Sequence, residues 1–232
     1  MSKGVTFYFV RHGETYLNLY NHMQGWANAP LTPEGISNVH RSGRGLADIE
    51  FDAVYTSDLQ RTIDTAEIIL QENHGKDLPI TPMKEFREVF FGSFEGRAAK
   101  DVWPKIVDEV HIKYDLPAGD ERDIRMTLNT IKELDPFHHA ESYPEFWNRV
   151  ESGLLQLLNK HAGTDQNILV VCHGMTIRNL LSGLVADFNE EEPLDNASVS
   201  IVEYKDGQFK MMAYGRTDHF KDIADGAGDK EQ

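Results

Sequence analysis

The sequence is poor in cysteine, in basic residues and in long apolar runs. One cysteine, Cys172, occurs in 232 residues, which excludes an internal disulfide framework and is typical of a reducing compartment. Lys and Arg number 23 against 38 Asp and Glu, for a formal net charge of −15. General binding to nucleic acid or to anionic membranes needs clustered cations. We therefore expect no nucleic-acid partner.

Long apolar segments are absent as well. The run VTFYFV at 5–10 is too short for the apolar part of a signal peptide, and it leads directly into Arg11. No run is long enough to cross a bilayer. We therefore expect a cytoplasmic protein without a membrane partner. A length of 232 residues suits one domain with a sizeable core, and no motif indicates a particular oligomeric state.

Strand and helix patterns alternate along most of the chain. The expected strands are the β-branched or aromatic runs 5–10, 51–57, 78–82 and 166–174, and 198–215 reads as a hairpin closed by Asp206 and Gly207. Helical patterns follow three of these strands; the one after 51–57 is expected to bury Leu59, Ile63, Ala66 and Leu70. This order predicts the α/β class, with a doubly wound, mostly parallel central sheet and helices on both faces.

One stretch departs from the alternation. Residues 97–149 are charged, rich in helical pattern and interrupted by four prolines. We interpret this stretch as a helical insertion, or cap, within a single domain that spans 1–232. The acidic tail at 222–232 is expected to fray.

Two of the expected strands end on a histidine that is followed by glycine. These pairs are His12-Gly13 and His173-Gly174. Ligands of doubly wound sheets bind beyond the carboxyl ends of the strands, and glycine lets backbone approach a ligand closely. One such histidine would be interpreted as the polar end of a strand. Two of them predict a shared crevice, provided that the two strands are neighbours.

Two arginines accompany these histidines. Arg11 directly precedes His12, and Arg61 falls in the first turn of the helix after the second expected strand. A guanidinium group can bind two phosphate oxygens at once, so the pattern favours a phosphate site. The alternative for Arg61 is a surface residue paired with Asp58 or Asp64.

Glu88 lies in an aromatic stretch without helix or strand pattern. Phe86, Phe90 and Phe91 surround it in sequence and could keep water from its carboxyl group. Such shielding would raise its pKa toward that of a general acid. The alternative is a solvated glutamate paired with Arg87.

A metal site built from the two histidines is a further possibility. Histidine is a common metal ligand. However, Arg11 lies next to one candidate ligand, and no compact cluster of His, Asp and Glu occurs in the sequence. We therefore expect neither a metal nor a cofactor.

Six segments together resemble the histidine phosphatase superfamily, in particular its phosphoglycerate mutase-like branch. They are RHGETYLN (11–18), LTPEG (31–35), TSDLQRTIDTAE (56–67), FREVFFGSFEG (86–96), ESYPEFWNRV (141–150) and VCHGMTIRNLL (171–181). The resemblance covers nearly the whole chain in the same order. RHG alone would be a weak signal, whereas RHGE with a downstream strand ending in HG is specific.

The resemblance implies a role for individual positions. His12 matches the nucleophile that becomes phosphohistidine, and Glu88 matches the proton donor. The residues that match groups holding the phosphoryl oxygens are Arg11, Arg61 and His173. Gly13 matches the residue whose carbonyl orients the nucleophilic ring, and further phosphate- or substrate-binding positions are Asn18, Gln24, Gly25 and Gly174. The implied partner is a small phosphorylated substrate.

The same pocket can hydrolyse a phosphomonoester or transfer its phosphoryl group. Cofactor-dependent phosphoglycerate mutases of the family carry a Tyr, paired Arg and a run of prolines after the glutamate motif. The matching stretch here has Arg97, Lys100 and Lys105, but neither paired Arg nor a proline run. Hydrolysis is therefore the favoured reading and mutase activity the alternative. A catalytically weak binding or regulatory protein of the same fold is a third reading, disfavoured because the matching catalytic positions are all occupied.

Overall fold

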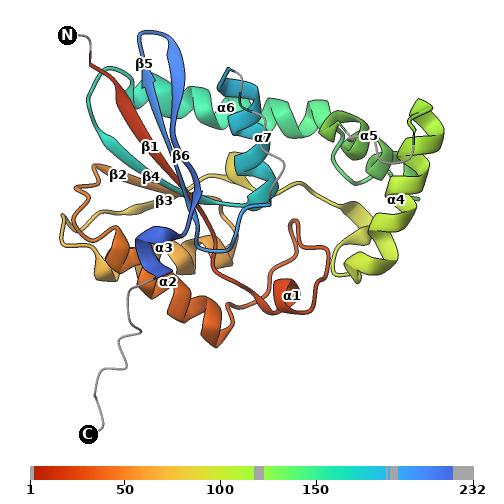
Figure 1. Ribbon diagram of the computed structural model, residues 1–232, viewed down its shortest axis with the longest axis horizontal. Coiled ribbons are helices and arrows are strands. Elements are labelled where there is room, and N and C mark those ends of the chain that lie inside the picture. The colour runs from red at the N-terminus through yellow and green to blue at the C-terminus, as the bar shows by residue number, and fades with distance from the viewer. Residues whose placement is uncertain (1–2, 118–122, 187, 189–192, 222–232) are drawn as a thin grey trace, which may run out of the picture.

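A six-stranded sheet forms the centre of the molecule. The computed structural model describes residues 3–117, 123–186, 188 and 193–221. The strands are β1 (Val5–Arg11), β2 (Ala53–Thr56), β3 (Ile80–Pro82), β4 (Asn167–Cys172), β5 (Val199–Lys205) and β6 (Gln208–Arg216). Their order is β3-β2-β4-β1-β5-β6 (Figure 1). The first four are parallel and the hairpin β5–β6 is antiparallel, so the predicted α/β fold with a mostly parallel sheet is confirmed.

Helices cover both faces of this sheet. They are α1 (Tyr16–Leu19), α2 (Pro33–Gly45), α3 (Gln60–Glu72), α4 (Ala99–Tyr114), α5 (Ile124–Leu134), α6 (Tyr143–His161), α7 (Gly174–Leu184) and α8 (Asp218–Lys221), with 3₁₀ turns at Lys84–Phe86 and Gly92–Phe94. Phe7 and Phe9 of β1 belong to the apolar cluster that includes α6 and α7. Val10 belongs to the opposite cluster, with α2, α3 and α8. The alternation follows from the two-residue period of a strand.

The two strands that end on histidine are parallel neighbours. In the ladder between β1 and β4, Val10 pairs with Val171 and Arg11 with Cys172. Both strands therefore end at the same edge of the sheet, and His12 and His173 follow them there. This register meets the condition that the sequence left open.

The predicted cap is helical, but its boundary requires correction. Helix α5 packs against α6, and α4 packs against α5, away from the sheet (Figure 1). Their buried Ile106 and Leu128 belong to the same apolar cluster as Phe146 of α6. The end expected near 149 falls inside α6, which continues without a break to His161. The tail at 222–232 lies outside the described residues.

The prediction for helix α3 is confirmed in part. Leu59 and Ala66 are buried as expected, whereas Ile63 and Leu70 are only half-buried. The buried face also includes Arg61, Thr62, Thr65 and Ile69. Polar side chains occupy this face because the first turns of α3 pack against the edge of the sheet where β1 and β4 end, and hydrogen-bond partners are available there. Thr65 Oγ1, for example, accepts from the backbone N–H of Gly13 at 3.0 Å.

Asp135 stabilises the turn between α5 and α6 through hydrogen bonds to its backbone. Its carboxylate accepts hydrogen bonds from the backbone N–H groups of Phe137, His139 and Ala140. Burial acts to raise the pKa of Asp135, but the hydrogen bonds outweigh it and lower the pKa to about 2. A carboxyl group with a depressed pKa stabilises the fold above its unfolded pKa and loses this contribution as the pH falls.

Replacement of Asp135 by asparagine should therefore destabilise the protein in a pH-dependent manner. We expect a loss of about 2 kcal/mol in the free energy of unfolding at neutral pH. The difference from wild type should shrink as the pH falls from about 4 toward about 2, where the wild-type carboxyl group takes up its proton. Urea unfolding at several pH values measures both effects. A difference that stays constant with pH would contradict the assignment.

Candidate active site

His12 and His173 meet beyond the ends of β1 and β4. Their ring centroids are 5.2 Å apart and the rings are inclined at 64°. His12 is 4% exposed and His173 0%. Arg61, from the first turn of α3, is also 0% exposed and contacts both rings. The structure thus brings together three of the residues that the sequence predicted for the site.

The ring of His12 is held in one tautomer. Its Nδ1 lies 2.8 Å from the carbonyl oxygen of Gly13. Because a carbonyl only accepts, Nδ1 carries the hydrogen and Nε2 keeps its lone pair. Burial, together with the charges of Arg61 and Arg11, lowers the pKa of His12 well below its ordinary value. The ring is therefore neutral, with Nε2 available as a nucleophile.

Arg61 uses all five of its N–H donors inside the protein. Its Nε donates to His12 Nε2 at 3.2 Å, and one terminal nitrogen donates to His173 Nδ1 at 3.0 Å. The remaining acceptors are Gly25 O, Ala27 O and Asn28 Oδ1. Burial lowers the pKa of Arg61 to about 10, and the nearby Glu88 and Glu95 oppose this shift. The alternative of a surface residue is wrong, because Asp58 pairs with Arg87 and Asp64 with Gln60.

His173 is neutral in the free protein. Since Nδ1 accepts from Arg61, the hydrogen is on Nε2, which lies 2.8 Å from Ser57 Oγ. Burial, and then the charge of Arg61, lowers the pKa of His173 well below its ordinary value. His173 can therefore become a cation only when substrate binds. The negative charge of a bound phosphate would raise the pKa of the ring, and the ring would then take up a proton.

Glu88 lies in the same pocket, 7% exposed. Its Oε1 accepts from the N–H groups of Val89 and Thr176 and from Thr176 Oγ1, whereas Oε2 accepts only from the N–H of Met175, at 3.0 Å. Burial raises the pKa of Glu88, although these hydrogen bonds and Arg61 act in the other direction. Oε2, with fewer donors, is the oxygen that can carry a proton. The alternative of a solvated glutamate paired with Arg87 is wrong.

Arg11 is oriented by the segment that precedes β5. One terminal nitrogen donates to the carbonyl oxygen of Leu194. Its Nε is buried without a hydrogen-bond partner. Asn196 of the same segment donates to the backbone carbonyl of His12 at 2.9 Å. Arg11 thus keeps a buried, unsatisfied donor at the pocket, as an anion-binding site requires.

The remaining predicted positions have different surroundings. Asn18 Oδ1 accepts from the backbone N–H of Thr15 and closes the first turn of α1. Gln24 Oε1 accepts from Thr15 Oγ1 at 2.7 Å, while its Nε2 is buried without a partner. Gln24 thus keeps a buried amide nitrogen without a partner among the described residues. Its contact with a ligand, like that of Asn18, stays a prediction. Gly174 begins α7, beside Arg11.

Two of the glycines are required for packing. A Cβ on Gly13 would lie 2.6 Å from a methyl group of Val39 in α2. A Cβ on Gly25 would collide with the Val89 carbonyl and the Glu95 carboxylate, and the Gly25 carbonyl binds Arg61. The contacts that Gly13 and Gly25 would make with a ligand stay a prediction.

Sequence reasoning missed several residues that hold this site together. Ser57 orients His173, Asn28 binds Arg61, and Asn196 holds the backbone at His12. Ser57 is the last residue of the strand predicted at 51–57 and so carried a weak signal. Asn28 and Asn196 lie in segments without pattern, where the sequence offers no signal.

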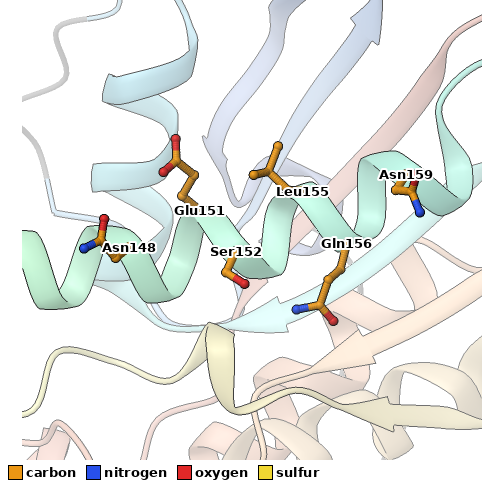
Figure 2. A pocket seen from close by; sticks show the side chains of 6 residues that line it. All are labelled: Asn148, Glu151, Ser152, Leu155, Gln156 and Asn159. Carbon is orange, nitrogen blue, oxygen red and sulfur yellow. The ribbon is translucent and has the colours of Figure 1, made fainter.

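Neither a metal-binding cluster nor a surface hollow on α6 includes the predicted site residues in the part of the chain that the structure describes. Within the described ranges, no group of three or more His, Cys, Asp and Glu side chains could hold a metal ion. A hollow of about 410 Å³ on the outer face of α6 is lined by Asn148, Glu151, Ser152, Leu155, Gln156 and Asn159 (Figure 2). None of the predicted site residues lines this hollow. Among the described helices, none is long and apolar enough to cross a membrane.

Comparison with known proteins agrees with this geometry. The family model described as "Histidine phosphatase superfamily (branch 1)" matches residues 7–217. The uncharacterized phosphatase PhoE of Bacillus subtilis (strain 168) is 27% identical over 212 residues, which cover 90% of this chain and 94% of that protein. A 2,3-bisphosphoglycerate-dependent phosphoglycerate mutase of Rhizobium etli is 32% identical over 185 residues, 77% of this chain and 79% of that protein.

Solved structures point the same way. The crystal structure of phosphoglycerate mutase from Bacillus anthracis str. Sterne superposes with a TM-score of 0.84 at 31% identity. The match covers 94% of this chain and 96% of that one. The similarity therefore extends over the cap as well as the sheet.

Proposed function

Because this chain belongs to the histidine phosphatase superfamily (branch 1) and is an enzyme of that type, we propose that it is a metal-independent phosphomonoester hydrolase. Its intermediate is a phosphohistidine on His12, and its proton donor is Glu88. The observation that carries the proposal is the neutral His12, whose Nε2 lone pair faces Arg61 beside a buried carboxyl group. Its substrate is a small phosphorylated molecule.

In the first step, His12 Nε2 attacks phosphorus and the bond to the ester oxygen breaks. Glu88 gives its proton to the leaving oxygen, so that an alcohol departs. The new N–P bond consumes the Nε2 lone pair that Arg61 Nε contacts in the free enzyme. That N–H is thereby released next to the phosphoryl oxygens, and Arg11 Nε supplies a second donor.

In the second step, the ionised Glu88 accepts a proton from water while the water oxygen attacks phosphorus. The N–P bond breaks, orthophosphate forms, and the neutral ring of His12 is restored. The positive charge that stabilises both transition states comes from two guanidinium groups, so that no metal is needed.

Mutase activity is the second candidate, favoured by the names of two of the relatives above. A bisphosphate cofactor brings a second phosphate that needs cations of its own. Of the described cations, those whose charge acts on the buried site are Arg11, Arg61 and Arg149, and Arg149 is bound by Glu141 at 2.7 Å. Arg97 lies over the ring of Phe94. These positions supply no second phosphate site, which supports hydrolysis.

An assay with EDTA present tests the proposal. We expect the purified protein to release phosphate from an aryl phosphate, without interconverting 3-phosphoglycerate and 2-phosphoglycerate when 2,3-bisphosphoglycerate is added. Loss of activity in EDTA would contradict the metal-independent mechanism. Cofactor-dependent interconversion would establish the mutase instead.

A further inference from the structure

We propose that Glu95 is a positioning residue for Arg61, and that it acts through the short loop 25–27. The inference rests on the proposed function, because it assigns to Arg61 the task of holding a phosphoryl group. Glu95 itself contacts neither ring of the site. It follows the second 3₁₀ turn, whose last residue is Phe94.

Glu95 binds the loop through backbone N–H groups alone. Oε2 accepts from Gly25 and Ala27, each at 3.0 Å. Oε1 accepts from Trp26 at 2.9 Å and from Phe91 at 3.0 Å. Three successive N–H groups of the loop thus converge on one carboxylate, which also ties the loop to the segment that follows Glu88.

The carbonyl groups of the same loop hold Arg61. Gly25 O accepts from Arg61 at 2.6 Å and Ala27 O at 3.0 Å. The loop therefore turns its N–H groups to Glu95 and two of its carbonyl groups to Arg61. Two donors of Arg61 point to the histidines. Its Nε donates to His12 Nε2, and one terminal N–H donates to His173 Nδ1. The phosphoryl group is proposed to bind between these two rings. A shift of the loop would consequently shift these donors.

The loop has little freedom to take another position. A Cβ on Gly25 would collide with the Val89 carbonyl and with Glu95. The Nε1 of Trp26 donates to the carbonyl oxygen of Glu88 at 2.8 Å. Glu95 thus places Arg61 relative to Glu88 as well as to the histidines. The negative charge of Glu95 also partly offsets the burial of the Arg61 guanidinium, as does Glu88 whenever it is ionised.

Replacement of Glu95 by glutamine tests this assignment. The side chain keeps its size, but an NH₂ group replaces one carboxylate oxygen. Each of these oxygens accepts from two backbone N–H groups, and an NH₂ group cannot accept from them, so the loop has to move. We expect kcat on an aryl phosphate to fall on the order of 10²-fold, since small displacements of a charged binding group have effects of this size. The affinity for orthovanadate, an analogue of the transferring phosphoryl group, should fall in parallel.

Glu145→Gln is the matched control. The Glu145 carboxylate also accepts a backbone N–H, that of Ser142 at the start of α6, and neither this bond nor its ion pair with Lys132 reaches the loop 25–27 or the turn before Glu95. This variant should lower the melting temperature and leave kcat and vanadate affinity unchanged. Glu95→Asp keeps the charge but shortens the side chain by one methylene group, and it should lower kcat and vanadate affinity less than Glu95→Gln does. If the glutamine variant does not fold, the aspartate variant is measured in its place.

The outcomes separate the two proposals. If Glu95→Gln keeps the wild-type kcat and vanadate affinity, or if Glu145→Gln loses as much of both, Glu95 does not position Arg61. If the wild-type protein binds vanadate but releases no phosphate from esters, the proposed hydrolysis fails, while the vanadate affinities of the variants still decide the role of Glu95. A wild-type protein that binds no vanadate overturns both.

Discussion

Replacement of His12 by alanine should abolish turnover while the protein remains folded. The side chain supplies the nucleophilic Nε2, and the other imidazole of the described site, His173, is bound by Arg61 at Nδ1 and by Ser57 Oγ at Nε2. We expect a loss in kcat on the order of 10⁴-fold or more, as for nucleophiles of other covalent enzymes. Acid-labile phosphate, trapped on the wild-type protein during turnover, should be absent from the variant.

His161→Ala is a suitable control for this experiment. His161 is as buried as His12, 4% exposed, but it bonds to Tyr55 and Gln166 away from the site. Its replacement should lower the melting temperature and leave the phosphohistidine detectable. Turnover near the wild-type level in folded His12→Ala would exclude the mechanism.

Replacement of Glu88 by glutamine should slow the reaction according to the leaving group. A general acid contributes about 10²- to 10⁴-fold, and its contribution is greatest when the leaving oxygen is a strong base. We therefore expect a large loss with alkyl phosphates and a small one with aryl phosphates of acidic phenols. Burial raises the pKa of Glu88, and the first step requires its proton. The rate of phosphohistidine formation in the wild type should hence fall as the pH rises through that pKa.

Rapid-quench kinetics with the two classes of ester measure both effects. In Glu88→Gln the decline with rising pH should disappear, because the amide does not titrate. The amide also replaces an acceptor of the Met175 N–H at the start of α7, so the melting temperature provides a check on folding. An equal loss for alkyl and aryl esters would mean that Glu88 acts on the structure rather than on the leaving oxygen.

The sequence by itself determined the class of fold and the chemical groups of the site. Strand runs in which apolar side chains alternate between the two faces, a Thr32 N-cap followed by Pro33 and a hairpin with Asp206 and Gly207 at positive φ are local features, and local physics is sufficient to predict them. Two strands that end on His-Gly indicated His12 and His173, because the carboxyl ends of neighbouring parallel strands meet at one edge of the sheet. The pairing of β1 with β4 meets this condition.

Only the tertiary structure decided how these groups are held and charged. The hydrogen bond from Gly25 to Glu95 spans 70 residues, and the one from Asn196 to His12 spans 184. No periodicity connects such segments, because both partners lie in loops whose conformation depends on what they pack against. The neutral state of His173 likewise follows from burial beside Arg61. Burial, and with it the charge of a histidine, is a property of the assembled core that the order of residues alone does not contain.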